Sequence, residues 1–187
     1  MNEILVLFGG LPPVSRLDSF IRRVTAQREC LNLAARLIGD IPGPVLEFGL
    51  GNGRTYDHLR ELFAEREIYV FDRRVAAHPE CIPDDDHMIL GDIAETLPLG
   101  QFRINAPAAL AHCDLGTGVR ADNEALADYI GPRLARLMTP RGLIVSDQEY
   151  LVDGWVSLDL PDGVKPGRYH IYRVGERPER SKDRYRP

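Results

Sequence analysis

Apolar residues follow a helical period before residue 39 and form short continuous runs after residue 44. From Leu17 to Ile38 they recur near helical spacing, with arginines and glutamines between them, which predicts a long amphipathic helix. The glycines and prolines of residues 39–44 end it, because proline cannot continue a helix and glycine suits a C-terminal cap. Residues 1–15 hold one apolar patch and then glycines and prolines, so we expect an extended arm that packs on the domain or on a partner.

The short apolar runs predict strands that alternate with helices, a pattern typical of a parallel sheet. The expected strands cover residues 45–48, 68–71, 87–90, 108–114 and 142–146. A helix is expected at 54–65, and a second helix, capped by Asp122, should kink or restart at Pro132.

The last part of the domain has a different pattern. Residues 155–158 and 169–174 predict an antiparallel pair at the C-terminal edge of the sheet, with the helix before it shortened or absent. The fold class is therefore α/β, with a single domain over residues 16–175. The charged, proline-containing tail, residues 176–187, shows no apolar periodicity and is expected to be disordered.

Composition narrows the possible functions. A chain of 187 residues with 27% charged residues fits one globular domain and leaves no room for a second. The net charge of −5 argues against a general nucleic-acid surface and favours a small molecule or a protein as substrate. Three cysteines without a C-x-x-C pair suit a reducing cytoplasm, and no run is long enough for a membrane span, so we expect a cytoplasmic protein.

A glycine-rich loop follows the first expected strand and carries the clearest chemistry. Gly49, Gly51 and Gly53 precede the helix that begins near Arg54. Glycine lets backbone N–H groups approach a ligand closely, and a helix N-terminus favours negative charge, so this loop should bind an anionic or zwitterionic ligand. Asp72 ends the next strand 23 residues after Gly49, where nucleotide-binding units place an acid for the ribose hydroxyls.

The pattern E-x-G-x-G-x-G, with Glu47 before the loop and Asp72 after the second strand, resembles the class I S-adenosylmethionine-dependent methyltransferases. A dinucleotide-binding fingerprint would place a small residue at position 54, where Arg54 stands, so an NAD(P)-dependent oxidoreductase is the weaker alternative. The resemblance implies a three-layer Rossmann-like fold, mostly parallel with an antiparallel hairpin at the C-terminal edge and with an added N-terminal helix.

The resemblance also assigns residues to S-adenosyl-L-methionine. The glycine loop would hold the methionine end, with Glu47 toward its ammonium, and Asp72 would bind the ribose. Asp92 would face the adenine amine, with Ile93 packing on the ring; the competing role for Asp92 is a helix cap. The residues assigned to the cofactor are Glu47, Phe48, Gly49, Gly51, Gly53, Asp72, Arg73, Asp92, Ile93 and Asp114.

Methyl transfer to a hydroxyl or a protonated amine needs a group that removes a proton. The candidates are His112, Asp114, Asp147 and Glu149, of which His112 and Asp114 are the expected catalytic residues, although a strand histidine can also be a packed core residue.

A metal site is the weaker alternative. Asp114 with Asp147 and Gln148 resembles the Asp and Asp-Asn ligands of Mg²⁺ in catechol-type O-methyltransferases, but glutamine replaces asparagine. We therefore expect no metal. If the magnesium interpretation held, EDTA would abolish methylation of a catechol and Mg²⁺ would restore it.

The sequence thus predicts a methyltransferase with a small-molecule acceptor. It lacks the N/D-P-P-Y/F motif of adenine and glutamine nitrogen methylation and the Pro-Cys of cytosine C5 methylation. A non-catalytic subunit that binds S-adenosylmethionine is the alternative. Because the chain leaves little material for a substrate domain, a homodimer that completes the acceptor pocket is also expected.

Overall fold

The computed structural model describes residues 15–176, so the predicted arm and tail lie outside the described residues except for Ser15 and Glu176. One seven-stranded sheet has the order β3-β2-β1-β4-β5-β7-β6. β7 runs antiparallel to both of its neighbours, and the other pairs are parallel. The strands are β1 (Val45–Phe48), β2 (Ile68–Asp72), β3 (Met88–Leu90), β4 (Ala108–Cys113), β5 (Met138–Ser146), β6 (Val156–Ser157) and β7 (His170–Arg173).

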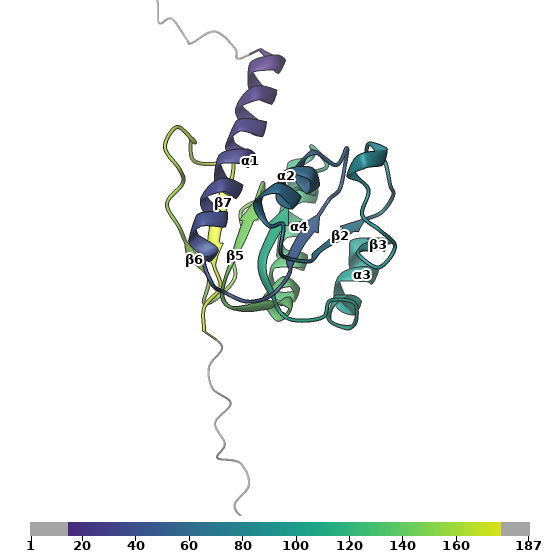
Figure 1. The fold of residues 1–187 in the computed structure, drawn as a ribbon. Coiled ribbons are helices and arrows are strands. Elements are labelled where there is room, and N and C mark those ends of the chain that lie inside the picture. The colour runs from purple at the N-terminus through teal and green to yellow at the C-terminus, as the bar shows by residue number, and fades with distance from the viewer. Residues whose placement is uncertain (1–14, 177–187) are drawn as a thin grey trace, which may run out of the picture.

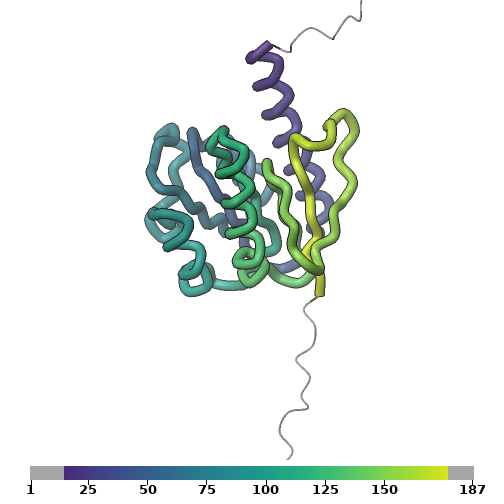
Figure 2. Tube along the Cα trace, turned by 180° about the vertical axis from the view of Figure 1, so that it is seen from behind, coloured from purple at the N-terminus to yellow at the C-terminus, as the bar shows by residue number. Residues whose placement is uncertain are grey.

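Helices cover both faces of this sheet and give the predicted three-layer α/β architecture (Figure 1). α1 (Arg16–Ile38) and α2 (Arg54–Leu62) pack on one face, and α3 (Ile93–Leu99) and α4 (Arg120–Leu137) pack on the other, which Figure 2 shows from behind. Two short 3₁₀ helices, η1 (Pro79–Cys81) and η2 (Gly100–Phe102), lie in the connections. No helix in the described part of the chain is long and apolar enough to cross a membrane.

The N-terminal helix forms where the apolar period predicts it. Ser15 caps α1, because its hydroxyl accepts a hydrogen bond from the Asp18 N–H at 2.9 Å. Leu31 and other apolar residues of the second half are buried on the sheet, whereas the first turns extend beyond it (Figures 1 and 2). Leu17 and Phe20 in these turns remain 66% and 44% exposed.

One prediction about a helix end is wrong. Val119 precedes the first residue of α4, so Asp122 lies in its first turn and does not cap it. The helix also continues through Pro132 without a restart. Ile130 and Leu134 on either side of the proline are buried, and this packing offsets the cost of the hydrogen bond that proline cannot make. The capping role of Asp92 is confirmed, since its Oδ1 accepts a hydrogen bond from the Ala94 N–H at 2.9 Å.

The connection from β5 to β6 contains no helix within the described residues 147–155, as the sequence predicts. Three aromatic side chains stabilise it instead. Trp155 contacts Tyr150 and Tyr172 with ring centroids 5.7 and 5.8 Å apart, and the Tyr172 hydroxyl accepts a hydrogen bond from the Tyr150 N–H at 2.9 Å. The segment that follows Asp147 is therefore held against the end of the sheet by packing.

Candidate active site

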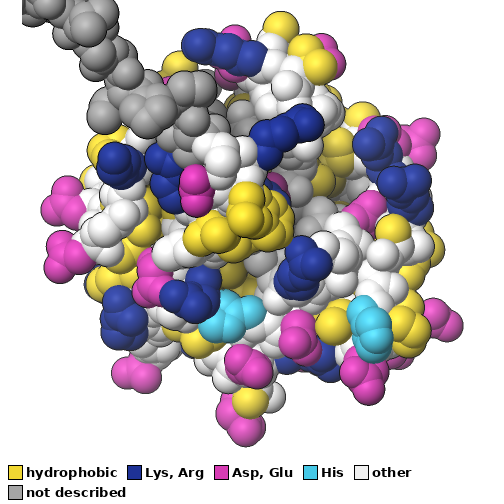
Figure 3. Space-filling model, turned by 90° about the horizontal axis from the view of Figure 1, so that it is seen from above, with side chains coloured by type: hydrophobic (Ala, Val, Ile, Leu, Met, Phe, Trp, Pro, Cys, Tyr) yellow, Lys and Arg dark blue, Asp and Glu magenta, His cyan; other side chains and the backbone are white. Residues whose placement is uncertain are grey.

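A cavity of about 890 Å³ lies where the parallel strands end. The face seen from above in Figure 3 bears acidic and basic side chains interspersed with apolar ones. Most of the residues that the sequence assigned to a cofactor border the cavity: Gly49, Gly51, Asp72, Arg73, Asp92, Ile93 and Asp114. Leu115, Thr117 and Leu126 also border it and were not assigned from the sequence.

The glycine loop approaches other backbone closely. Gly49 has a φ of 99°, and a Cβ added there would lie 2.4 Å from the carbonyl oxygen of Asp114. Its N–H donates to the carbonyl of Phe71 at 2.9 Å. A side chain at this position would therefore disrupt the contact between the loop and the end of β4.

Asp72 connects the second strand to this loop. Its Oδ2 accepts a hydrogen bond from the Gly51 N–H at 3.1 Å, and its Oδ1 accepts one from the Arg74 N–H at 3.1 Å. The carboxylate is therefore held at the edge of the cavity, and its remaining lone pairs are available to a ligand with hydroxyl groups.

Three of the assigned residues do not border the cavity. The Phe48 ring is buried and stacks on Phe71 with centroids 4.6 Å apart, so it belongs to the core. Gly53 begins α2, and a Cβ there would lie 2.4 Å from the Cβ of Cys81. Glu47 is fully buried on β1, and its Oε1 has no hydrogen-bond partner. The first two contribute to packing, whereas Glu47 has a free acceptor beside the loop.

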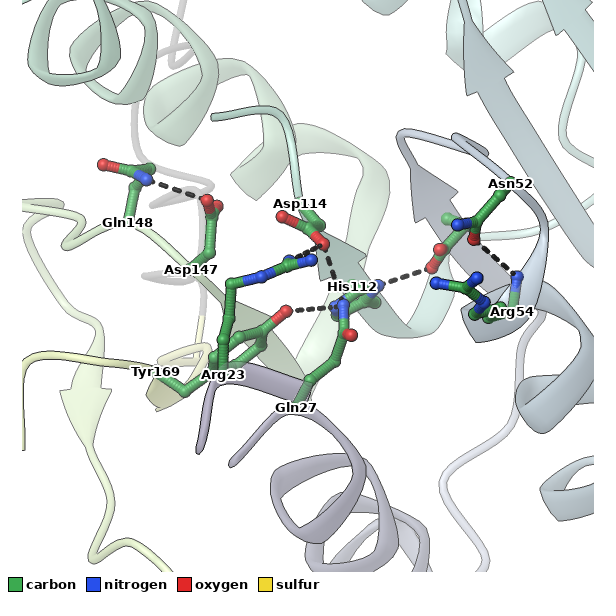
Figure 4. Close-up of polar contacts among 10 residues, drawn as sticks. Arg23, Gln27, Asn52, Arg54, His112, Asp114, Asp147, Gln148 and Tyr169 are labelled. Carbon is green, nitrogen blue, oxygen red and sulfur yellow. Dashed lines mark hydrogen bonds and ion pairs between the residues drawn. The ribbon is translucent and has the colours of Figure 1, made fainter. Parts of the chain in front are cut away.

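His112 lies in a buried group of polar side chains beneath α1 (Figure 4). Its Nδ1 is 2.6 Å from Glu47 Oε2, and its Nε2 is 3.1 Å from the Tyr169 hydroxyl. Burial lowers the pKa of His112, but the carboxylates of Glu47, Asp114 and Asp147 together raise it, so the net shift is upward. With both ring nitrogens engaged and no exposure, His112 is better placed to orient other groups than to accept a proton from a substrate.

Asp114 receives two side chains from α1. Arg23 Nη1 and Gln27 Nε2 lie 3.0 and 2.9 Å from Asp114 Oδ2, and Figure 4 shows both pointing toward it. No role was predicted for either residue from the sequence. Their separation of four positions places them on one side of the helix, but only the packing of α1 on the sheet shows that this side faces Asp114.

Asp147 follows β5 and lies against Gly116, a residue of the cavity wall. Its Oδ2 accepts a hydrogen bond from Gln148 Nε2 at 2.8 Å, and its Oδ1 is buried without a partner. Burial and the negative charge of Asp114 raise the pKa of Asp147 to about 6. Asp114 thus borders the cavity and Asp147 lies behind Gly116 of its wall, and of these two carboxylates Asp114 is the one that forms an ion pair within residues 15–176.

A metal held by Asp114, Asp147 and Gln148 stays an untested alternative. Within residues 15–176, no group of three or more His, Cys, Asp or Glu side chains is placed to hold a metal ion. The positive charge beside Asp114 comes from the guanidinium of Arg23.

The fold, with this cavity at the switch point of its sheet, is typical of α/β proteins that bind a nucleotide-like ligand. The family model described as S-adenosyl-L-methionine methyltransferase matches residues 14–174, and the chain belongs to this family. Its cofactor is S-adenosyl-L-methionine. No curated protein sequence matches the chain.

Solved structures show the same architecture. The S-adenosyl-L-methionine methyl transferase from Silicibacter pomeroyi DSS-3 is 47% identical, with a TM-score of 0.81 over 87% of this chain and 99% of that one. The SAH-bound methyltransferase PaMTH1 from Podospora anserina is 16% identical, with a TM-score of 0.54 over 90% and 100% of the two chains. Human methyltransferase-like protein 13 in complex with SAH is 15% identical, with a TM-score of 0.50 over 87% and 82%. The last two show likeness of fold alone.

Proposed function

We propose that this protein transfers the methyl group of S-adenosyl-L-methionine to a hydroxyl or amine of a small molecule, with Asp147 accepting the proton. One observation carries this proposal. Asp147 has a buried oxygen without a partner and a pKa raised to about 6, beside an Asp114 that is already paired with Arg23. A base whose pKa is near the working pH is effective and is still ionised at neutral pH.

The described residues fit the cofactor. Gly49 and Gly51 present backbone to the cavity, and any side chain at Gly49 would meet Asp114. Asp72, held at the cavity edge, would take the ribose hydroxyls, and Asp92 and Ile93 would take adenine. The orphaned Oε1 of Glu47 would accept from the ammonium of the methionine end.

The chemistry asks little of the protein beyond placement. When bound, S-adenosylmethionine supplies a methyl group on a positively charged sulfur, which makes that carbon electrophilic. The acceptor oxygen or nitrogen forms a bond to the methyl carbon as the sulfur–carbon bond breaks, and S-adenosylhomocysteine leaves with the electron pair. Asp147 takes the proton that the acceptor loses. The protein must hold acceptor and methyl in line, which accounts for a large part of such rate enhancements.

The size of the site supports a small acceptor. The cavity of about 890 Å³ must hold both cofactor and acceptor, and the described residues form one domain around a single sheet. Ligand sites for small molecules commonly have volumes of roughly 300–1,000 Å³. A macromolecular acceptor would have to present its reactive group through this opening.

The test is formation of S-adenosylhomocysteine from S-adenosylmethionine in the presence of acceptors that carry phenol, alcohol or amine groups. We expect turnover with at least one class and none with their fully methylated counterparts. Thermal shifts with S-adenosylhomocysteine and with NAD measure binding independently. Binding of S-adenosylhomocysteine without turnover on any class would support a non-catalytic subunit.

A further inference from the structure

A continuous group of buried polar side chains connects three strands beneath α1. Glu47 on β1 and His112 on β4 are partners in the parallel register, so their side chains lie next to each other on the same face of the sheet. Tyr169, immediately before β7, completes the group, and the side chains of Glu47 and His112 have no exposed surface. Polar groups buried to this extent in a central sheet are costly unless they serve each other or a ligand.

The two oxygens of Glu47 differ. Oε2 is 2.6 Å from His112 Nδ1, whereas Oε1 is buried with no hydrogen-bond partner. A buried carboxylate oxygen without a donor loses its hydration and gains nothing in return. Glu47 precedes by two residues Gly49, whose backbone borders the cavity, and Gln27 Nε2 connects His112 to Asp114, which borders the cavity as well. The missing donor is therefore expected from a ligand in this cavity.

His112 determines where that free oxygen points. Its ring is held from the far side by the Tyr169 hydroxyl, 3.1 Å from Nε2, and the two rings are nearly parallel at 6°. Tyr169 thus holds the His112 ring, and the His112 ring holds Oε2 of Glu47. Gln27 Nε2 also lies 3.5 Å from His112 Nε2, which adds a contact from α1.

We propose that His112 is a positioning residue for the cofactor: it holds the Glu47 carboxylate so that Oε1 accepts a hydrogen bond from the α-ammonium of the methionine end. His112 acts through Glu47 and touches neither cofactor nor acceptor. The inference concerns only cofactor binding, so it stands or falls independently of the acceptor and of Asp147.

The experiment compares two ligands by calorimetry. The first is S-adenosylhomocysteine, and the second is its desamino analogue, which keeps the carboxylate and lacks the ammonium. The unmodified protein should bind the first about tenfold more tightly or better, as expected for a hydrogen bond to a charged group. Equal affinities would overturn the proposal without any variant being made.

The variants assign the effect to His112. In His112→Leu the preference for the ammonium should fall to about twofold or less, with the affinity for the desamino analogue nearly unchanged. His112→Asn, whose amide can still donate near the position of Nδ1, should keep most of the preference. Equal weakening of both ligands in His112→Leu and in His112→Asn would show a merely structural role. A preference that persists in a folded His112→Leu would also contradict the proposal.

Discussion

The two ends of the cavity, which we assign to the cofactor and to the acceptor, are built in different ways. At the cofactor end, Gly49, Gly51 and Asp72 come from two consecutive strand ends. The N–H groups of the two glycines donate to the Phe71 carbonyl and to the Asp72 carboxylate. At the acceptor end, Asp114 pairs with Arg23 from a distant helix, and the charges of both residues act on Asp147. The first end is specified by local chain geometry, and the second by how separate elements pack.

This difference predicts that the two ends can be impaired separately. In the proposed site the glycine loop binds the cofactor through backbone atoms, so changes at Asp147 should leave cofactor affinity intact. The charges at the acceptor end depend on one another, because the carboxylate of Asp114 raises the pKa of Asp147 and the guanidinium of Arg23 lowers it. Changes there should alter rate and pH dependence.

The largest effect is expected for Asp147→Asn, which removes the proton acceptor and retains the shape of the side chain. Turnover should fall by about 100-fold or more, as is typical when a general base is lost. The affinity for S-adenosylhomocysteine, measured by calorimetry, should stay within about twofold because Asp147 lies at the other end. Glu149→Gln is the matched control on a neighbouring exposed acid. If Glu149→Gln caused the greater loss, the base would be Glu149.

Asp72→Ala should weaken cofactor binding by more than about tenfold, because charge-assisted hydrogen bonds to the ribose are lost and the Gly51 N–H loses its acceptor. Isothermal titration with S-adenosylhomocysteine measures this. Asp128→Ala, an exposed acid on α4, serves as the control for loss of one negative charge. Unchanged affinity in Asp72→Ala would remove this residue from the site.

The pH profile offers a test that needs no variant. A base works only when ionised, so kcat/KM should rise with pH and level off above about 6, following the raised pKa of Asp147. Below this value the rate should fall about tenfold per pH unit, as expected for one required ionised group. If kcat/KM stayed constant from about pH 5 to about pH 7, no ionised group with a pKa in this range would be required.

The smallest expected effect is a shift of that profile in Arg23→Gln. The guanidinium of Arg23 lowers the pKa of Asp147, so its removal should move the acid limb of kcat/KM above about 6. Arg22→Gln, a change on the neighbouring exposed arginine, should leave the limb in place. A limb that moves equally in both variants would show a general charge effect. An unmoved limb in Arg23→Gln would separate Arg23 from the base.

The sequence predicts the fold and the cofactor end well for the same physical reason. Strand runs, the glycine loop and Asp72 are local patterns, and strand ends of a parallel sheet meet at one edge whatever the details of packing. The start of α4 was predicted wrongly from the local signal of Asp122, and the helix does not restart at Pro132, where the flanking Ile130 and Leu134 are buried.

The acceptor end was harder to predict. Asp114 and Asp147 could be proposed from their positions after strands, but Arg23, Gln27 and Tyr169 could not, because their contacts arise only when α1 and β7 pack on the sheet. His112 shows the same limit. Its position on a strand left open whether it is a catalytic residue or a packed core residue. The register that pairs it with Glu47 places it in a buried polar group, which favours a positioning role.

The aromatic side chains after Asp147 give the protein a built-in optical probe. Trp155 is the single tryptophan in the chain, and it contacts Tyr150, in the segment that follows Asp147, and Tyr172 on β7. Emission excited in the red edge of the indole band therefore comes from this one place. A change in its intensity or wavelength on addition of an acceptor would signal occupancy in real time, without any label attached to protein or ligand.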